Sequence, residues 1–272
     1  MKKILVPFAL FCVLCCSSCN RRNASLESLI MATVSDSVQV FPEALTPEDG
    51  VSANAFICLE IPQKGLRGKA LRKIRKSIVS EALGEEYADM NCADAVSACL
   101  GAYAQNYLSD AREIAGGDDT QALLHTLNYA REINGEVVSL QDGILAYRIS
   151  IYDYAGGAHG TYTENWLNFR ASDGTSLRPE LIFTENGRET LDYLLKTELQ
   201  AGGHSFWNYE GAESAWLDRN FFFEQDSIRF YYNPYEVDCY AAGPVCVALP
   251  LELVVPLLDE KKLKLNLENS DE

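Results

Sequence analysis

The sequence predicts an α+β fold, in which antiparallel sheets carry helices packed on one face. Two observations predict it. Apolar residues recur at helical spacing in a few long stretches and alternate with polar residues at strand spacing in others, so that helices and strands follow one another in blocks. The 272 residues, 47% of them hydrophobic and 23% charged, are enough for one large core or two smaller ones. We therefore expect two α+β subdomains.

The first block opens with a strand and continues with two helices. Residues Val51–Ile61 alternate between apolar and polar, which indicates a strand. Apolar residues at helical spacing predict a helix from about residue 67 to residue 83. A second helix is expected to begin with Asp89 as its N-cap and to run toward Ile114, where Gly116 ends it.

Alternation then dominates from residue 123 to residue 169, which predicts an antiparallel meander with a turn at Asp142-Gly143. Helical spacing returns twice before three last strands and a short helix. The expected segments are Leu123–Ile133, Ile144–Tyr154 and Thr161–Phe169 for the meander; Leu177–Phe183 and Arg188–Leu199 for the helices; Phe221–Phe223, Ser227–Tyr232 and Val245–Leu249 for the last strands; and Leu251–Leu258 for the closing helix.

The N-terminus predicts a bacterial lipoprotein signal. A short basic start is followed by an apolar run from Ile4 to Cys16, too short to span a bilayer core of about 30 Å. Ser17-Ser18-Cys19 resembles the lipoprotein box, in which Cys19 becomes the acylated first residue of the mature chain. A plainly secreted chain cut nearby is the alternative. No acidic cluster follows Cys19, so we expect an outer-membrane lipoprotein that faces the periplasm.

The composition divides the chain into four expected segments. Residues 1–18 are the expected signal peptide. Residues 19–50 carry Ser, Thr, Pro and Glu with few large apolar side chains, and we expect a flexible tether between lipid and body. Residues 51–135 are expected to form an N-terminal α+β domain, and residues 136–272 a C-terminal α+β domain that contains the sequence YAGGAHG.

Five cysteines follow the signal region. Cys92 and Cys99 lie roughly 10.5 Å apart along one predicted helix, beyond disulfide reach, and are expected to be buried. Cys239 and Cys246 would face each other across a two-residue turn, so a disulfide and two free thiols both stay open. No metal site is expected, because no CxxC motif remains and no histidine stands at ligand spacing from a cysteine.

The charge balance is acidic, with one basic segment. Thirty-nine acidic and 23 basic residues give a net charge of −16, which repels phosphate-rich polymers, so nucleic acid is not an expected partner. Seven basic residues crowd between Lys64 and Lys76. This segment favours either a patch for an anionic glycan, a lipid headgroup or a partner, or a solvated helix face that carboxylates balance elsewhere.

The most unusual stretch is Tyr152-Asp-Tyr-Ala-Gly-Gly-Ala-His-Gly160, because adjacent glycines between strands indicate positive φ angles or a close approach. Asn168-Phe169 with Asp173-Gly174, Phe230-Tyr-Tyr-Asn-Pro-Tyr-Glu236 and Tyr240-Ala-Ala-Gly-Pro244 accompany it.

Together these motifs resemble the RsiV-like family of extracytoplasmic domains of unknown function. These domains occur in lysozyme-sensing anti-sigma factors and ahead of the catalytic domain of some peptidoglycan deacetylases. The resemblance implies a two-part α+β architecture whose second part is distantly like a subdomain of the actin-like ATPases. It transfers no catalytic residue, and it implies neither nucleotide binding nor a cofactor.

Function is expected to be recognition. HExxH, GxSxG and a close set of acidic and histidine ligands are all missing from the sequence, so we expect no enzyme. The expected function is a lipid-anchored, non-catalytic cell-envelope protein that binds a basic, lysozyme-like protein or peptidoglycan glycan. The alternative is a cell-wall hydrolase or deacetylase accessory enzyme that uses surface carboxylates and His159. A purely structural envelope protein is a third class.

Candidate ligand-binding residues surround the Gly-Gly turn, since aromatic rings and histidine offer both stacking and hydrogen bonds. A turn histidine packed on a neighbouring tyrosine is the structural alternative for His159, and strand alternation is expected to bury some of the others. The candidates are Tyr154, Gly156, Gly157, His159, Tyr162 and Trp166.

Overall fold

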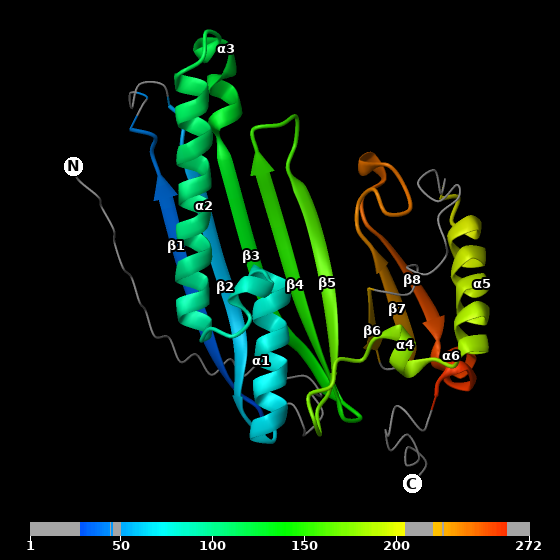
Figure 1. Cartoon of the computed structure of the whole chain (residues 1–272). Helices are drawn as coiled ribbons and strands as arrows, with labels where there is room; N and C mark the ends of the chain where they lie inside the picture. Colours follow the sequence, from blue (N-terminus) through cyan, green and yellow to red (C-terminus); the bar gives the residue numbers. More distant parts are fainter. Residues whose placement is uncertain (1–27, 44, 46–49, 205–219, 225, 260–272) are drawn as a thin grey trace.

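The computed structural model describes residues 28–43, 45, 50–204, 220–224 and 226–259 (Figure 1). The expected signal peptide and Cys19 lie outside these ranges. The described strands form a five-stranded sheet in the order β1-β2-β3-β4-β5 and a three-stranded sheet in the order β6-β7-β8. Helices pack against both sheets, which confirms the α+β class.

The strands are β1 (Ile30–Val40), β2 (Ala53–Lys64), β3 (Tyr129–Gln141), β4 (Ile144–Ala155), β5 (Thr161–Arg170), β6 (Phe221–Glu224), β7 (Ser227–Tyr232) and β8 (Val245–Pro250). The helices are α1 (Gly68–Leu83), α2 (Cys92–Ala115), α3 (Thr120–Leu123), α4 (Pro179–Ile182), α5 (Glu185–Ala201) and α6 (Leu251–Val254), with short 3-10 turns η3 (Glu85–Tyr87), η4 (Leu124–Leu127), η5 (Tyr240–Ala242) and η6 (Val255–Leu257).

β1 lies inside the segment that was expected to be a tether, so that prediction is wrong for residues 30–40. The strand pairs antiparallel with β2 over its whole length. Val34, Val38 and Val40 pack against the first core, while serine, aspartate and glutamine fill most of the positions between them. That polar composition made the strand look like a linker. The folded body therefore begins well before residue 51.

β2 and β3 are parallel, although only antiparallel pairs were expected. The helices α1, α2 and α3 lie between these strands in the chain and supply the long crossover that a parallel pair requires. β3 begins at Tyr129 rather than Leu123, because residues 120–127 form α3 and η4. The expected domain boundary between residues 135 and 136 falls inside β3.

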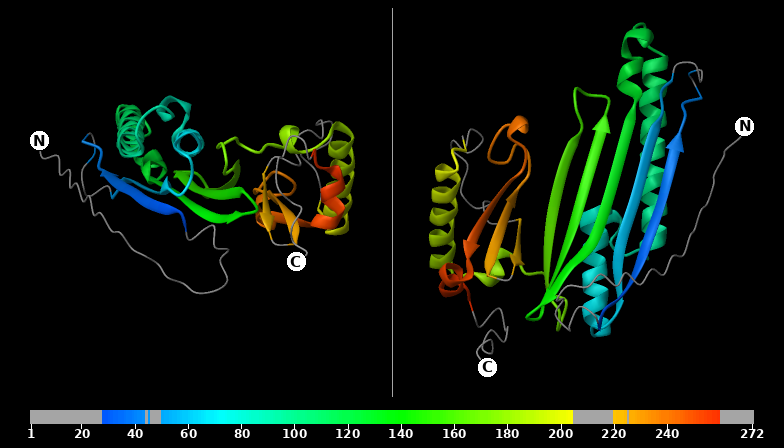
Figure 2. Two further views of the ribbon diagram at one scale, coloured as in Figure 1. Left: turned by 90° about the horizontal axis from the view of Figure 1, so that it is seen from below. Right: turned by 180° about the vertical axis from the view of Figure 1, so that it is seen from behind.

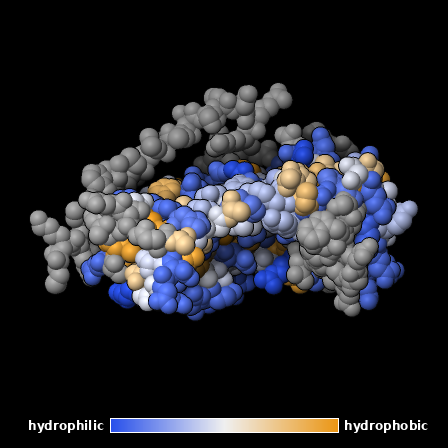
Figure 3. All heavy atoms as spheres, turned by 90° about the horizontal axis from the view of Figure 1, so that it is seen from above, coloured by the Kyte–Doolittle hydropathy of each residue, from blue (hydrophilic) through white to orange (hydrophobic). Residues whose placement is uncertain are grey.

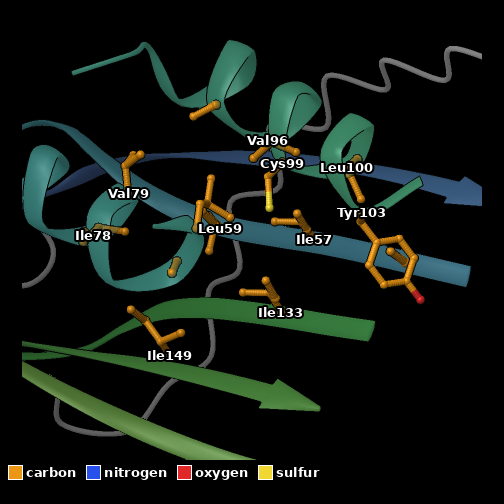
Figure 4. Close-up of a cluster of buried hydrophobic side chains, with 14 of the residues drawn as sticks. Ile57, Leu59, Ile78, Val79, Val96, Cys99, Leu100, Tyr103, Ile133 and Ile149 are labelled. Atoms are coloured by element: carbon orange, nitrogen blue, oxygen red, sulfur yellow. The ribbon is translucent and has the colours of Figure 1, made fainter. Parts of the chain in front are cut away.

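The first core lies between the five-stranded sheet and the two long helices, α1 and α2 (Figure 4). α1 begins and ends within a residue of its prediction. α2 starts later than expected, with Asn91 rather than Asp89 as its N-cap: the Asn91 side chain accepts a hydrogen bond from the Asp94 backbone N–H at 3.0 Å. Both Cys92 and Cys99 lie on this helix; Cys99 is buried as expected, whereas Cys92, in its first turn, is only partly buried.

The second core lies between α5 and the three-stranded sheet, with Leu191, Leu195 and Leu199 of the helix fully buried. All residues of the two cores lie between Leu29 and Leu258, so removal of residues 1–19 takes nothing from either. Cys239 and Cys246 are exposed free thiols. Cys239 precedes η5 and Cys246 follows it in β8, so the two cysteines do not face each other across a two-residue turn. None of the described helices has the length and apolar character needed to cross a bilayer.

Candidate binding face

Strand alternation puts different side chains on the two faces of the five-stranded sheet. Along β2 the odd-numbered residues from Ala53 to Ile61 are buried beneath the helices, and the even-numbered residues point to the other side. Among the described elements, α1 and α2 both lie on the first side (Figure 2). We call the opposite side the open face. Its central residues are Phe56, Glu132, Arg148, Tyr152, Tyr162, Glu164 and Trp166.

One row of the open face consists of aromatic side chains around a carboxylate. The pairing registers place Phe56 beside Glu132, Glu132 beside Tyr152 and Tyr152 beside Tyr162. The three rings are exposed at 41%, 39% and 38%. Three strand spacings separate the ends of this row, or about 14 Å. Three exposed rings and one carboxylate, placed side by side by the register of four strands, form a surface that a ligand can cover.

A second row combines charge with stacked rings. Arg148 forms ion pairs with Glu136 and, at 3.8 Å, with Glu164. Its guanidinium group lies 5.8 Å from the centre of the Trp166 ring, within cation–π range. Trp166 in turn stacks on Phe222 of β6 at 3.8 Å between ring centres. The row therefore continues from the large sheet onto the small one.

Glu164 is the most buried carboxylate of the open face, with 9% of its surface exposed. It accepts a hydrogen bond from the Tyr162 hydroxyl at 2.7 Å. Burial and this bond to a negative charge raise the pKa of Tyr162 to about 12. Burial and the nearby Glu164 also raise the pKa of Tyr231, which belongs to β7. The open face thus extends across the junction between the two sheets.

Asparagine side chains join the two sheets at that junction. The Asn233 Oδ1 atom accepts from the Glu164 backbone N–H at 2.6 Å, and the Asn220 Oδ1 atom accepts from the Trp166 N–H at 2.8 Å. The Nδ2 groups of Asn220 and Asn233 both donate to the Glu164 carbonyl. Asn168 adds a bond from its Nδ2 group to the Phe221 carbonyl at 2.6 Å. The amides of Asn220 and Asn233 thus satisfy backbone groups of β5 that would otherwise form an open sheet edge.

The loop between β4 and β5 packs its histidine against the connection between β7 and β8. The His159 ring stacks on Tyr240 at 3.9 Å between centres, and its Nε2 atom lies 3.3 Å from the Tyr235 hydroxyl. Its Nδ1 atom lies 2.9 Å from the Gly160 carbonyl, which also accepts from the Tyr240 hydroxyl at 3.0 Å. Tyr235 adopts a left-handed backbone with φ of 72°, which costs energy in a non-glycine residue. Figure 3 views this end of the molecule, where the described surface is mostly hydrophilic or neutral.

The two adjacent glycines of this loop differ. Gly156 is buried with φ of 74°, and an added Cβ would overlap the Thr126 carbonyl group. Gly157 is exposed, has no positive φ, and an added Cβ would meet only the His159 carbonyl oxygen at 3.9 Å. The predicted close approach of another segment is therefore real at Gly156, where it is an internal contact, and is not a requirement at Gly157.

The structure divides the sequence-predicted candidates into two groups. Tyr154, Tyr162 and Trp166 all lie on the open face. Gly156, Gly157 and His159 lie in the loop at the end of β4, where His159 packs against two tyrosines of the connection between β7 and β8 rather than against Tyr152 or Tyr154 of its own hairpin. The single predicted cluster is thus a sheet face and a separate loop contact.

Sequence reasoning missed Phe56, Glu132, Arg148, Tyr152 and Glu164. The alternation of side chains along each strand could have identified them. Once one buried residue of a strand is known, the residues directly before and after it belong to the other face. Strand order was also needed, because Phe56 and Tyr162 are far apart in sequence. Within the described ranges, no group of three His, Cys, Asp or Glu side chains is placed to hold a metal ion.

Comparison with known proteins identifies one family model in this chain. The model, described as "Protein of unknown function (DUF3298)", matches residues 182–252, which span the second core from α4 to α6. A search of curated proteins finds no match.

Solved structures extend the likeness to most of the chain. A crystal structure of a DUF3298 family member from Bacteroides fragilis is 24% identical, with a TM-score of 0.72, and the match covers 87% of this chain and 97% of the other. A DUF3298 family protein from Pseudomonas aeruginosa is 12% identical, with a TM-score of 0.54 and coverage of 85% and 95%. At these identities the likeness concerns the fold. The chain thus contains a DUF3298 match in its second half, and over most of its length its fold is similar to that of solved members of that family.

Proposed function

We propose that this protein is a lipid-anchored, non-catalytic binding protein of the cell envelope that takes its ligand on the open face. Cys19 is the proposed lipid site, and the periplasmic side of the outer membrane is the proposed location. The observation that carries the proposal is the row of exposed rings and carboxylate formed by Phe56, Glu132, Tyr152 and Tyr162.

Charge favours a basic protein of the lysozyme type as the ligand. Glu132 and Glu136 are exposed on the open face, and Arg148, its central cation, is engaged by two carboxylates. The net charge of −16 adds a long-range attraction for a cationic partner and speeds their encounter. Tyrosine rings beside acidic groups are suitable contacts for lysine and arginine side chains.

A neutral stretch of peptidoglycan glycan is the second candidate. The same aromatic row favours it, because the apolar faces of sugar rings stack on exposed tyrosine and phenylalanine rings. The acidic groups do not favour the peptide carboxylates of peptidoglycan, so we place this ligand second.

The contacts of His159 support a non-catalytic role. Its ring is held by Tyr235, Tyr240 and the Gly160 carbonyl, which are contacts that orient a structural histidine. The nearly buried Glu164 is engaged by Tyr162 and Arg148, and so is committed to internal contacts.

Calorimetry tests the proposal on a chain of residues 20–272. We expect heat of binding with hen-type lysozyme at low salt and a loss of affinity as salt rises, because surface charges are screened. Tyr152→Ala is expected to weaken binding at least tenfold, as removal of a central aromatic contact does. Tyr193→Ala is the matched control, since Tyr193 is 69% exposed on α5, away from the open face.

Murein sacculi provide the second arm of this experiment. Retention on sacculi without lysozyme binding would assign the open face to glycan. No binding in either arm, or catalytic turnover of a muropeptide by a metal-free sample, would contradict the proposal.

A further inference from the structure

The basic segment that the sequence singled out forms a stripe on α1. Lys69, Arg72, Lys73 and Lys76 stand at positions i, i+3, i+4 and i+7, so they lie along one side of the helix. All four are exposed, while the opposite side of α1 supplies buried apolar residues to the first core. The four cations therefore lie on the solvent-exposed side of α1, which faces away from the sheet.

Two further cations extend this feature beyond the N-terminal end of α1. Lys64 and Arg67 are exposed, and no Asp or Glu occurs from residue 61 to residue 80. We call Lys64, Arg67, Lys69, Arg72, Lys73 and Lys76 the basic stripe. Among its described contacts, the Lys76 Nζ atom pairs with Asp89 at 2.5 Å.

Arg75 does not belong to the stripe, because its side chain turns toward β2. It donates to the Pro62 carbonyl at 2.8 Å and to the Gln63 carbonyl at 3.0 Å. These bonds tie the middle of α1 to the end of β2 and hold the stripe in place. A helix face that is only solvated can carry charges of either sign. A segment with cations alone, in a protein with a net charge of −16, therefore favours a binding patch.

The chain enters the folded body beside this stripe. Ile30, the first residue of β1, pairs with Lys64. An added Cβ on Gly65 would lie 2.5 Å from the Ser28 carbonyl oxygen, so residues 28 and 65 are in contact. The start of β1 and the N-terminal end of α1 accordingly lie side by side (Figure 2, right).

The position of β1 also shortens the connection to the proposed lipid. Ser28 follows Cys19 by nine positions, so nine residue-to-residue steps join them. Fully extended, they reach about 30 Å. An anchor at Cys19 therefore keeps the entry point, and the cations around it, close to the membrane surface.

We propose that the basic stripe docks the body on the anionic phospholipid surface in which the protein is anchored. This inference rests on the lipid anchor of the proposed function. Lysine and arginine residues near an anionic membrane surface each bind favourably, and a lipid chain combined with a basic patch anchors more firmly than the lipid alone. Because α1 and the open face lie on opposite sides of the sheet, a docked body presents its open face away from the membrane.

The test uses the unacylated chain of residues 20–272, which retains both cores, with vesicles of phosphatidylglycerol and of phosphatidylcholine. We expect co-sedimentation with the anionic vesicles alone, decreasing as salt rises. The double variant Arg72→Gln/Lys73→Gln is expected to bind about 25-fold more weakly, at about fivefold for each cation removed. Arg112→Gln/Lys196→Gln removes the same charge from exposed sites on α2 and α5 and is expected to bind as the unchanged chain does.

Three results would overturn the docking proposal: no binding to anionic vesicles, equal binding to both kinds of vesicle, or equal losses in the two double variants. Unchanged thermal unfolding of both variants shows that a loss of binding is not a loss of fold. Lysozyme titration of the same proteins keeps the two proposals apart. Vesicle binding without lysozyme binding contradicts only the ligand proposal, and lysozyme binding without vesicle binding contradicts only the docking proposal.

Discussion

The two faces of the five-stranded sheet are built from the same strands but present different side chains. On β2, Ile57 is 1% exposed beneath the helices, whereas its neighbour Phe56 is 41% exposed on the open face. The centre of the covered face is apolar and continuous with the helices, as the interior of a domain must be. The open face retains large rings beside carboxylates without that protection. A sheet that needed only stability would have polar residues there, so we infer that the exposed rings serve binding.

The largest expected difference between the faces is in the free energy of unfolding. Ile57→Ala removes a buried side chain and leaves a cavity, at a cost of about 2–5 kcal/mol. Phe56→Ala on the other side of the same strand is expected to cost less than about 1 kcal/mol. Urea denaturation of both variants measures the contrast. Equal losses would mean that Phe56 is covered in solution and that the open face is not open.

The two glycines at the end of β4 give the next largest contrast. Gly156→Ala places a Cβ against the backbone of Thr126 and forces a left-handed residue, which together cost about 2–4 kcal/mol. Gly157→Ala makes only an ordinary van der Waals contact, with the His159 carbonyl oxygen, and is expected to change stability by less than about 0.5 kcal/mol. Thermal unfolding of the two variants decides the matter. A destabilised Gly157→Ala would show a structural constraint that the described contacts lack.

Asn233→Ala tests the junction that carries the open face from one sheet to the other. The substitution leaves the backbone N–H of the nearly buried Glu164 without its acceptor, which costs about 1–3 kcal/mol. We also expect faster amide exchange in β5 and β6, where the asparagine bonds hold the sheets together. Unchanged exchange at this junction would mean that the amide bonds do not hold it.

The smallest expected effect concerns the covered face. The buried Tyr147 hydroxyl has no hydrogen-bond partner among the described residues, and burial raises the pKa of Tyr147. Tyr147→Phe removes this polar group and is expected to be neutral or to stabilise the protein by about 0.5–1 kcal/mol. Calorimetric melting measures it. A loss of more than about 1 kcal/mol would show that the hydroxyl has a bound partner such as water.

Much of the fold could be predicted from local patterns, and the missed parts have physical reasons. The amphipathic stripe of α1 and the alternation of β4 and β5 are strong signals that the structure confirms. β1 was missed because its outward positions are mostly threonine, serine and glutamine and because Asp36 interrupts the valines of its inward side, so that the strand resembles a linker. The parallel pairing of β2 with β3 depends on how 64 residues of intervening chain fold back, and no local pattern records that.

The candidate site was only partly predictable for the same reason. Tyr154, Tyr162 and Trp166 were identified because they flank an unusual glycine turn, and all three lie on the open face. Phe56 and Glu132 join them only through strand order and register. The structural alternative for His159 was packing on a tyrosine of its own hairpin, but its partners Tyr235 and Tyr240 come from a loop about 80 residues later.

The central claim is that the open face binds the ligand, and side-chain footprinting tests it most directly. Hydroxyl radicals oxidise exposed aromatic rings, and mass spectrometry reads each ring separately. With saturating lysozyme or glycan, we predict reduced oxidation of Phe56, Tyr152 and Tyr162 and unchanged oxidation of Tyr193 on α5. Unchanged oxidation of the three rings while the ligand is bound would contradict the claim, because the ligand would then occupy another surface.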